Sequence, residues 1–342
     1  MENENIKILK KKLKMNKMKK SRILLWLLVG IYCASCSTSA DRLPGAVGNT
    51  GDVLVVMRDY LWNGASGDTI RHYLTEPVMG LPSLEPTFTL QQNDVLTTFL
   101  QRTRNILNIN IDPGYEMATL RYHTDVNAKH QIIFYIDAPS ADSAIAGFIR
   151  NKDLIIAGFL MKGRDAIIED YKKSVDNSIV ERLLEKYQVN ILIPKPYTLD
   201  VEREEFVWIS RIEGERQYGI LMWNEPYTST SQLEIDNLIT KMNTMTRRNV
   251  PGAIAGSYMA DEPTVTPEVK RYEKNGVYTV QLNGLWQMEN GFMGGPYVSQ
   301  TIVDIERGQL ITAHGFVYYP NRNKRQMIRQ LEAILHTMMP AE

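Results

Sequence analysis

The residues best suited to chemistry lie between positions 284 and 300, in the stretch GLWQMENGFMGGPYVSQ. Trp286, Glu289 and Asn290 combine an aromatic ring, a carboxylate and an amide, and Gly294 and Gly295 follow shortly after them. Glycine permits a sharp bend, or lets another backbone or a ligand approach closely. The stretch therefore predicts either a tight connection between two strands or the wall of a binding site, and the sequence leaves both interpretations open.

Three further residues are candidates for binding, and each has a structural alternative. Glu85 lies between two prolines in LPSLEPTF, so it belongs either to an extended loop that crosses a pocket or to an ordinary solvated loop. His314 lies in a predicted strand. Its side chain either faces a cleft, where it could bind a ligand, or is an ordinary hydrogen-bonded histidine of the sheet. Trp223 and Trp208 lie on neighbouring predicted strands. If their rings are exposed, they are candidates to stack on sugar rings, and if they are buried, they are a pair of core tryptophans.

Catalytic and metal-binding motifs are absent from the sequence. It contains no G-x-S-x-G nucleophile elbow, no H-E-x-x-H zinc motif and no glycine-lysine phosphate loop. No two of its five histidines have the spacing of metal ligands on one element. We therefore predict no metal and no cofactor, and the sequence identifies no catalytic residue.

The charge distribution separates the N-terminus from the rest of the chain. The first 35 of 342 residues hold nine Lys or Arg and two Glu, which leaves 30 basic and 37 acidic residues, a net charge of −7, in the remainder. Proteins that bind nucleic acid use clustered Lys and Arg side chains to neutralise phosphate groups, and this acidic remainder has no such cluster. We therefore exclude nucleic acid as a partner.

Residues 1–35 have the organisation of a bacterial signal peptide. A lysine-rich segment precedes the apolar stretch ILLWLLVGIYCAS, which is shorter than the roughly 20 apolar residues of a transmembrane helix. Ala34 and Ser35 then precede Cys36, as at a lipoprotein cleavage site, and the only other cysteine is Cys33. We predict that Cys36 is lipidated and that the protein contacts the membrane through this N-terminal lipid. The alternative is an uncleaved signal anchor.

Residues 36–51 are small, polar and glycine-rich, which predicts a flexible tether. Asp41 is the only acidic residue in this segment. The tether therefore differs from the acid-rich tags of surface-displayed lipoproteins. We predict an outer-membrane lipoprotein that faces the periplasm.

The rest of the chain predicts an α+β fold of two similar units, residues 52–173 and 174–342. In the segments 105–150 and 190–246 an Asn-Ile-Leu strand precedes a hairpin, a proline and a helix. The second unit is therefore a candidate duplicate packed on the first, unless ordinary α+β alternation imitates a repeat. We expect each unit to have an antiparallel or mixed sheet with helices packed on one face.

Alternating apolar residues predict a half-buried strand over 277–288 with Trp286 on its apolar face, and further strands over 296–305 and 309–319. Between the first two, Asn290-Gly291 has the composition of a tight turn, since both residue types accept a positive φ. The pattern over 93–103 predicts a helix.

The segments GDTIRHYLTEPVMGLPSLEPTFTLQQ and GLWQMENGFMGGPYVSQ resemble a family of Bacteroidota lipoproteins that is classed as a domain of unknown function. The resemblance spans nearly the whole chain after the tether, residues 50–338. It implies a lipid-anchored envelope protein, and it supplies no reaction, cofactor or catalytic residue.

Two classes of function follow from these observations. We predict a binding or assembly module that contacts another envelope protein or a glycan. The alternative is a hydrolase of an envelope polymer that uses paired carboxylates. An enzyme needs at least two titratable groups converging in one pocket, whereas a binding module needs none, so the position of these groups discriminates between the two.

Overall fold

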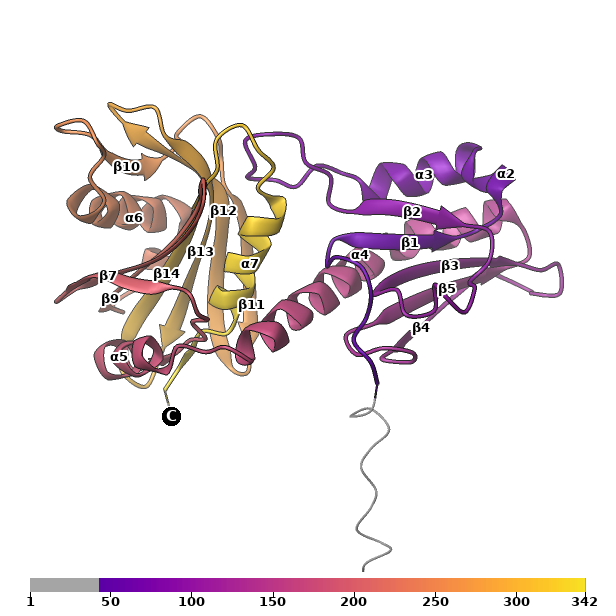
Figure 1. The fold of residues 1–342 in the computed structure, drawn as a ribbon, viewed down its shortest axis with the longest axis horizontal. Helices are drawn as coiled ribbons and strands as arrows, with labels where there is room; N and C mark the ends of the chain where they lie inside the picture. Colours follow the sequence, from indigo (N-terminus) through magenta and orange to yellow (C-terminus); the bar gives the residue numbers. More distant parts are fainter. Residues whose placement is uncertain (1–42, 342) are drawn as a thin grey trace, which may run out of the picture. The chain divides into compact units, whose positions relative to one another are not determined.

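The computed structural model of the protein describes residues 43–341. The predicted signal peptide, Cys36 and the first part of the predicted tether lie outside the described residues. Two main β-sheets follow one another along the chain, and Figure 1 labels most of their strands and helices.

The smaller sheet has the strand order β2-β1-β3-β5-β4. β1 pairs in parallel with β2 and β3, β3 pairs in parallel with β5, and β4 pairs antiparallel with β5. The central strands are buried on both faces, which explains their continuous apolar sequences. The strands are β1 (Asp52–Val56), β2 (Thr89–Asn93), β3 (Asn105–Ile111), β4 (Thr119–Thr124) and β5 (Ile132–Ala138).

Helices cover one face of the smaller sheet. Phe148 and Phe159, from the long helix α4, pack with Leu107 and Phe134 of the sheet. α4 begins after Ser140, whose side chain accepts a hydrogen bond from the backbone N–H of Ser143. The helices of this region are α2 (Asp59–Trp62), α3 (Ala65–Leu74) and α4 (Ala141–Lys172).

The opposite face of this sheet is covered by residues 94–101, which form bends and turns. The prediction of a helix over 93–103 was therefore wrong. The Asn93 side chain donates a 2.7 Å hydrogen bond to the carbonyl oxygen of Val95, and Asp94 accepts one from the backbone N–H of Asp59. Such side-chain to backbone bonds compete with a helix, while Leu96 and Leu100 still pack against the sheet.

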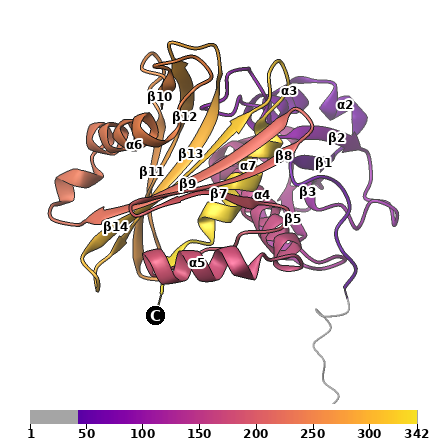
Figure 2. The ribbon, with the colours of Figure 1, turned by 60° about the vertical axis from the view of Figure 1, so that its left-hand side comes forward.

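The larger sheet is antiparallel, with the order β10-β12-β13-β14-β9-β8-β7, and β11 also pairs with β12. Figure 2 turns the ribbon so that β7, β8, β9 and β14 are seen side by side. β6 (Val189–Asn190) and β15 (Met339–Pro340) form a separate short ladder. The strands of the larger sheet are β7 (Thr198–Arg203), β8 (Phe206–Glu213), β9 (Arg216–Pro226), β10 (Tyr258–Asp261), β11 (Glu268–Lys274), β12 (Val277–Glu289), β13 (Gly294–Asp304) and β14 (Gln309–Tyr318).

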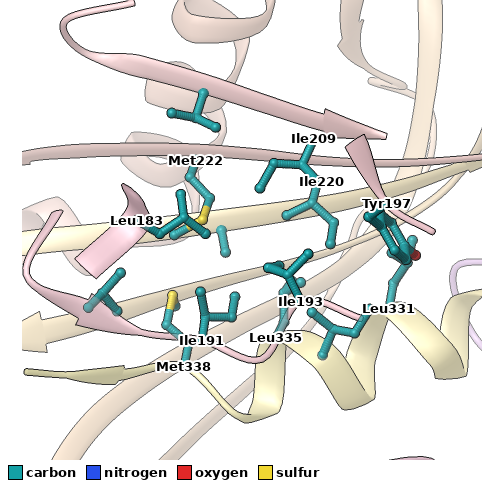
Figure 3. Close-up of a cluster of buried hydrophobic side chains, with 14 of the residues drawn as sticks. Leu183, Ile191, Ile193, Tyr197, Ile209, Ile220, Met222, Leu331, Leu335 and Met338 are labelled. Carbon is teal, nitrogen blue, oxygen red and sulfur yellow. The ribbon is translucent and has the colours of Figure 1, made fainter. Parts of the chain in front are cut away.

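Both faces of the larger sheet carry helices, a difference from the expected single covered face. α5 (Asn177–Tyr187) and α7 (Arg325–His336) pack on one face, where they build the cluster drawn in Figure 3. η2 (Thr230–Leu233) and α6 (Ile235–Asn249) pack on the other, and Figure 1 shows α6 and α7 on opposite sides of β12 and β13. The strands of this sheet therefore contribute side chains to two separate cores. None of the helices in the described part of the chain is long and apolar enough to cross a bilayer.

The α+β class with two sheet-bearing regions is confirmed. The predicted duplication is contradicted by strand order. β5 lies between β3 and β4 and is parallel to β3, whereas β7, β8 and β9 are neighbours in chain order and antiparallel. The second Asn-Ile-Leu segment also contributes only a two-residue strand, β6. The shared sequence pattern reflects ordinary α+β alternation.

Candidate functional site

A pocket of about 300 Å³ lies where β12 turns into β13. Its walls are the chain segments 285–288 and 291–295, together with Pro82 and Glu262. β10 pairs with β12 so that Asp261 is opposite Trp286, which brings the following residue, Glu262, to the pocket. The stretch singled out in the sequence is thus both a strand connection and the wall of the pocket.

Trp286 and Gly295 form the inner wall of this pocket. They are opposite each other in the β12–β13 register. The Trp286 indole passes over Gly295 and donates a 3.2 Å hydrogen bond from Nε1 to the carbonyl oxygen of Val317. A Cβ at Gly295 would lie 2.1 Å from that oxygen and 3.1 Å from Nε1. Glycine is required at 295 because an indole and a neighbouring strand approach it closely.

The turn itself differs in part from the prediction. Asn290 has a φ of 55°, as expected of a tight turn, whereas Gly291, Gly294 and Gly295 do not have a positive φ. The Gly291 N–H donates to the carbonyl oxygen of Met288, which closes the turn. Gly294 and Gly295 belong to β13, so their role is close packing and not an unusual backbone conformation.

Three exposed apolar side chains, Met79, Leu84 and Phe292, lie on the two segments that approach each other at the pocket, and we call them the apolar rim. Their exposed fractions are 65%, 88% and 99%. Gly80 lies against Asn283 of β12, where an added Cβ would be 3.1 Å from the Asn283 carbonyl. Pro82 of the same loop lines the pocket together with Phe292, so the loop of Met79 and Leu84 and the hairpin of Phe292 both border the pocket.

Glu85 attaches this loop to the start of α7 through buried hydrogen bonds. Its two carboxylate oxygens accept hydrogen bonds from the backbone N–H groups of Lys324 and Arg325, at 2.7 and 2.9 Å, at the start of α7. The residue is 4% exposed, so it is neither a solvated loop carboxylate nor available to a ligand. Glu85 is a helix cap supplied from a distant part of the sequence.

Glu262 is the one titratable residue among the described residues that line the pocket. The side-chain hydroxyl and the backbone N–H of Thr264 donate to its carboxylate, and these hydrogen bonds lower the pKa of Glu262. Glu289 does not line the pocket, and its carboxylate accepts a 3.1 Å hydrogen bond from Gln287. Asn290 is exposed at the turn and also lies outside the lining.

His314 and Trp223 lie in the core between the larger sheet and α6, at 1% exposure each. The His314 ring lies 4.9 Å from the Tyr297 ring and 6.3 Å from the Trp223 ring, measured between centroids. Burial lowers the pKa of His314 to about 3. Neither side chain is open to solvent, and with Trp286 at 2% exposure, none of these aromatic faces is displayed to a sugar.

No group of three or more His, Cys, Asp or Glu residues in the described part of the chain is arranged to hold a metal ion. Sequence reasoning missed Pro82, Glu262 and Phe292. Phe292 directly follows the predicted Asn-Gly turn, but its residue type gave no sign of exposure, because Phe is among the residues most often buried. Pro82 and Glu262 carried no signal either, since they reach the pocket through the packing of separate segments.

Comparisons with solved structures give only partial likenesses. The chain is similar to LpqN of Mycobacterium tuberculosis, described as involved in cell envelope biogenesis, with 12% identity, 45% of this chain and 83% of that chain covered, and a TM-score of 0.28. It is similar to a protein of Bacteroides thetaiotaomicron with 10% identity over 45% and 46% of the two chains and a TM-score of 0.21.

A third similar structure is the human StarD13 lipid transfer and protein localization domain, with 11% identity, 48% of this chain and 96% of that chain covered, and a TM-score of 0.21. Scores this low support no conclusion about the function of the present chain. No curated protein sequence matches it.

Family comparisons divide the chain into two parts. Residues 46–172 match a family described as a domain of unknown function, DUF8532, and residues 176–337 match another, DUF4837. The two matches meet just after the end of α4. The chain therefore combines two regions that each match a family of unknown function, and the pocket is built mainly by the second.

Proposed function

We propose that this protein is a lipid-anchored outer-membrane protein of Bacteroidota that faces the periplasm and binds an apolar segment of another envelope protein at the pocket and its apolar rim. The anchor is inferred from the signal-peptide organisation of residues 1–35 and from Cys36. The binding role is inferred from the surface at Phe292.

The observation that carries the binding role is the exposure of the rim. Phe292 is 99% exposed and is one of the residues that line the pocket. Leu84 and Met79 add exposed apolar side chains on the adjoining loop. Exposed apolar residues on segments that line a concave site are typical of surfaces that bind a partner, and Phe and Met are enriched at the cores of such interfaces.

A protein partner fits this chemistry better than a glycan. Sugar recognition uses exposed aromatic faces together with several polar groups. Phe292 is exposed, but Trp223 and Trp286 are buried and Glu262 is the one charged residue among the described residues that line the pocket. The rim consists of Met, Leu and Phe side chains, which gain more from contact with apolar side chains than from contact with hydroxyl groups.

The hydrolase alternative has less support. A glycoside hydrolase with paired carboxylates places the two groups on either side of the scissile bond. Glu262 is the one carboxylate among the described residues that line the pocket, and Glu289 and Glu85 are engaged elsewhere. The pocket therefore supports binding.

The binding role is tested by co-purification from envelope membranes of the full chain and two variants. Phe292→Asp places a charge on the rim, and Ile305→Asp is the matched control, because Ile305 is 73% exposed in the turn at the other end of β13. We expect Phe292→Asp to reduce recovery of a specific partner by about tenfold or more, while Ile305→Asp leaves it unchanged. Equal recovery with both variants would contradict the proposal.

Glu262→Gln separates the two functional classes. It removes the charge and keeps the shape, so a binding module should retain its partner and its cellular role. Loss of the cellular role with an intact partner complex would favour the hydrolase.

The anchor is tested by labelling cells with a radioactive fatty acid. The wild-type chain should incorporate the label, and Cys36→Ala should not. Incorporation into Cys36→Ala would refute lipidation at this position.

A further inference from the structure

A group of buried polar side chains lies behind the pocket, on the face of the larger sheet that α6 covers. Both ring nitrogens of His314 and the indole Nε1 of Trp223 are fully buried and have no hydrogen-bond partner within residues 43–341. Asp261 is 8% exposed and accepts a 2.7 Å hydrogen bond from the Tyr297 hydroxyl. We call His314, Trp223, Asp261 and Tyr297 the inner cluster.

Buried polar atoms without partners are rare and unfavourable in folded proteins. Burial lowers the pKa of His314 to about 3, so its imidazole is neutral at ordinary pH. A neutral imidazole offers one N–H donor and one acceptor nitrogen. The space around His314 is too small for a water molecule, so a bridging water does not satisfy these atoms in this packing. A group that brings its own donor and acceptor would relieve the cost.

Methionine side chains are prominent in the surroundings of His314. Met242, Met245, Met259 and Met288 belong to the core cluster between α6 and the sheet, and Met242 and Met259 lie directly beside the narrow space that His314 borders. Methionine is unbranched and flexible, and it adapts its shape to ligands more readily than Leu or Ile. A chain can therefore enter between α6 and the sheet by displacing methionine side chains.

Trp286 separates this space from the open pocket. It lines both the pocket and the space beside His314. Glu262 borders the pocket and its neighbour Asp261 borders the inner space. The two spaces would join if the Trp286 indole gave up its hydrogen bond to the Val317 carbonyl oxygen and moved aside.

We propose that the pocket opens past Trp286, when the Trp286 and methionine side chains move aside, into a concealed site for a single aliphatic chain with an uncharged polar end, a hydroxyl or a carbonyl, which hydrogen-bonds to His314. The chain lies against the methionines and the polar end lies at the inner cluster. This site concerns a small ligand, and it does not depend on the protein partner proposed above.

We infer an uncharged polar end for the ligand from the charged groups that border the space. An anionic end would lie close to Asp261, the one acidic residue among the described residues that border the space. A cationic end would need that carboxylate, which the Tyr297 hydroxyl already engages at 2.7 Å. A hydroxyl or carbonyl needs no counter-charge and avoids the cost of burying an ion.

The test is photo-affinity labelling of the full chain in envelope membranes with a ten-carbon alcohol that carries a diazirine in mid-chain. We expect labelled peptides to contain Met242, Met259 or Trp286. Decan-1-ol should compete with the probe at least about tenfold better than n-decane, the advantage expected of a single buried hydrogen bond. Labelling confined to surface residues, or equal competition by the alkane, would overturn the assignment.

His314 variants provide the matched comparison. His314→Phe should reduce labelling about tenfold, and its melting temperature should be equal or higher because two unpartnered polar atoms are removed. His314→Gln keeps a donor and an acceptor and should retain most of the labelling, and His72→Phe, on the exposed surface of α3, should change nothing. Unchanged labelling in a folded His314→Phe variant would refute the site, and if that variant does not fold, the comparison of decan-1-ol with n-decane in the wild type decides.

Leu84→Asp keeps this inference separate from the proposed function, because Leu84 belongs to the apolar rim but does not line the pocket. The variant should lose the protein partner and still take up the alcohol probe. If the wild type captures its protein partner but is not labelled by the alcohol probe, the concealed site is refuted and the proposed protein-binding function is not.

Discussion

Trp286 Nε1 donates its hydrogen bond to the carbonyl oxygen of Val317, two strands away in the larger sheet. The indole reaches that oxygen because the residue between them, Gly295, has no side chain. One glycine thus sets the position of the pocket's inner wall. Substitutions at Gly295, where the Trp286 indole passes over the backbone, test how the site is built.

Gly295→Ala should destabilise the protein strongly. The new Cβ would overlap the Val317 oxygen at 2.1 Å and crowd the Trp286 indole. We expect a loss of about 1–3 kcal/mol in the free energy of unfolding, the usual cost of overpacking, measured by urea denaturation.

Gly45→Ala is the control for this substitution. Gly45 has open space around its Cα and does not have a positive φ. Its free energy of unfolding should stay within about 0.5 kcal/mol of the wild type. An equal loss of unfolding free energy for Gly45→Ala and Gly295→Ala would show that the close approach of the Trp286 indole to Gly295 does not require a glycine.

Glu85→Ala should destabilise the start of α7. The substitution leaves the backbone N–H groups of Lys324 and Arg325 without the carboxylate that caps them. Hydrogen bonds to charged groups contribute about 1.5–3 kcal/mol, so we expect a loss of that order in urea denaturation. Glu76→Ala, at an exposed carboxylate in the same part of the chain, should have little effect. A fully stable Glu85→Ala variant would contradict the capping role.

His314 makes stability fall as the pH decreases. An unfolded histidine takes up a proton near pH 6.5, whereas burial lowers the pKa of folded His314 to about 3. Between these values the unfolded chain binds a proton that the folded chain does not, so the free energy of unfolding falls as the pH falls below 6.5. Between pH 7.5 and pH 5 the expected loss from this residue is about 2 kcal/mol.

His336 acts in the same direction, because burial and the nearby charges of Arg164 and Lys274 lower its pKa to about 3 as well. The contribution of His314 is isolated with His314→Phe, measured by urea denaturation at several pH values. The variant should lose less stability than the wild type on acidification. Parallel pH dependence of the two proteins would show that His314 is accessible to protons in the fold.

Local sequence patterns predicted much of the site. Alternation placed Trp286 on the apolar face of its strand, and Asn290 takes the positive φ expected of the turn. These features depend on residues within a few positions of one another. The strands on either side of the turn were predicted for the same reason.

Non-local packing explains what the sequence did not reveal. Glu85 caps a helix that begins 240 residues later, and no pattern near LPSLEPTF indicates that partner. The reason for glycine at 295 lies on β14, and the burial of His314 comes from α6 and β10. The turns that replaced the helix predicted over 93–103 also depend on a contact with Asp59.

Site-specific photo-cross-linking at Phe292 tests the central claim most directly. A photoreactive phenylalanine analogue replaces Phe292 in one variant and Ile305 in another, which are separated by the length of β13, on the order of 30 Å at roughly 3.3 Å per residue. In intact cells we predict one discrete cross-linked protein at position 292 that Leu84→Asp abolishes, and none at position 305. Cross-links at both positions, or a product at 292 that Leu84→Asp leaves unchanged, would contradict binding at the apolar rim.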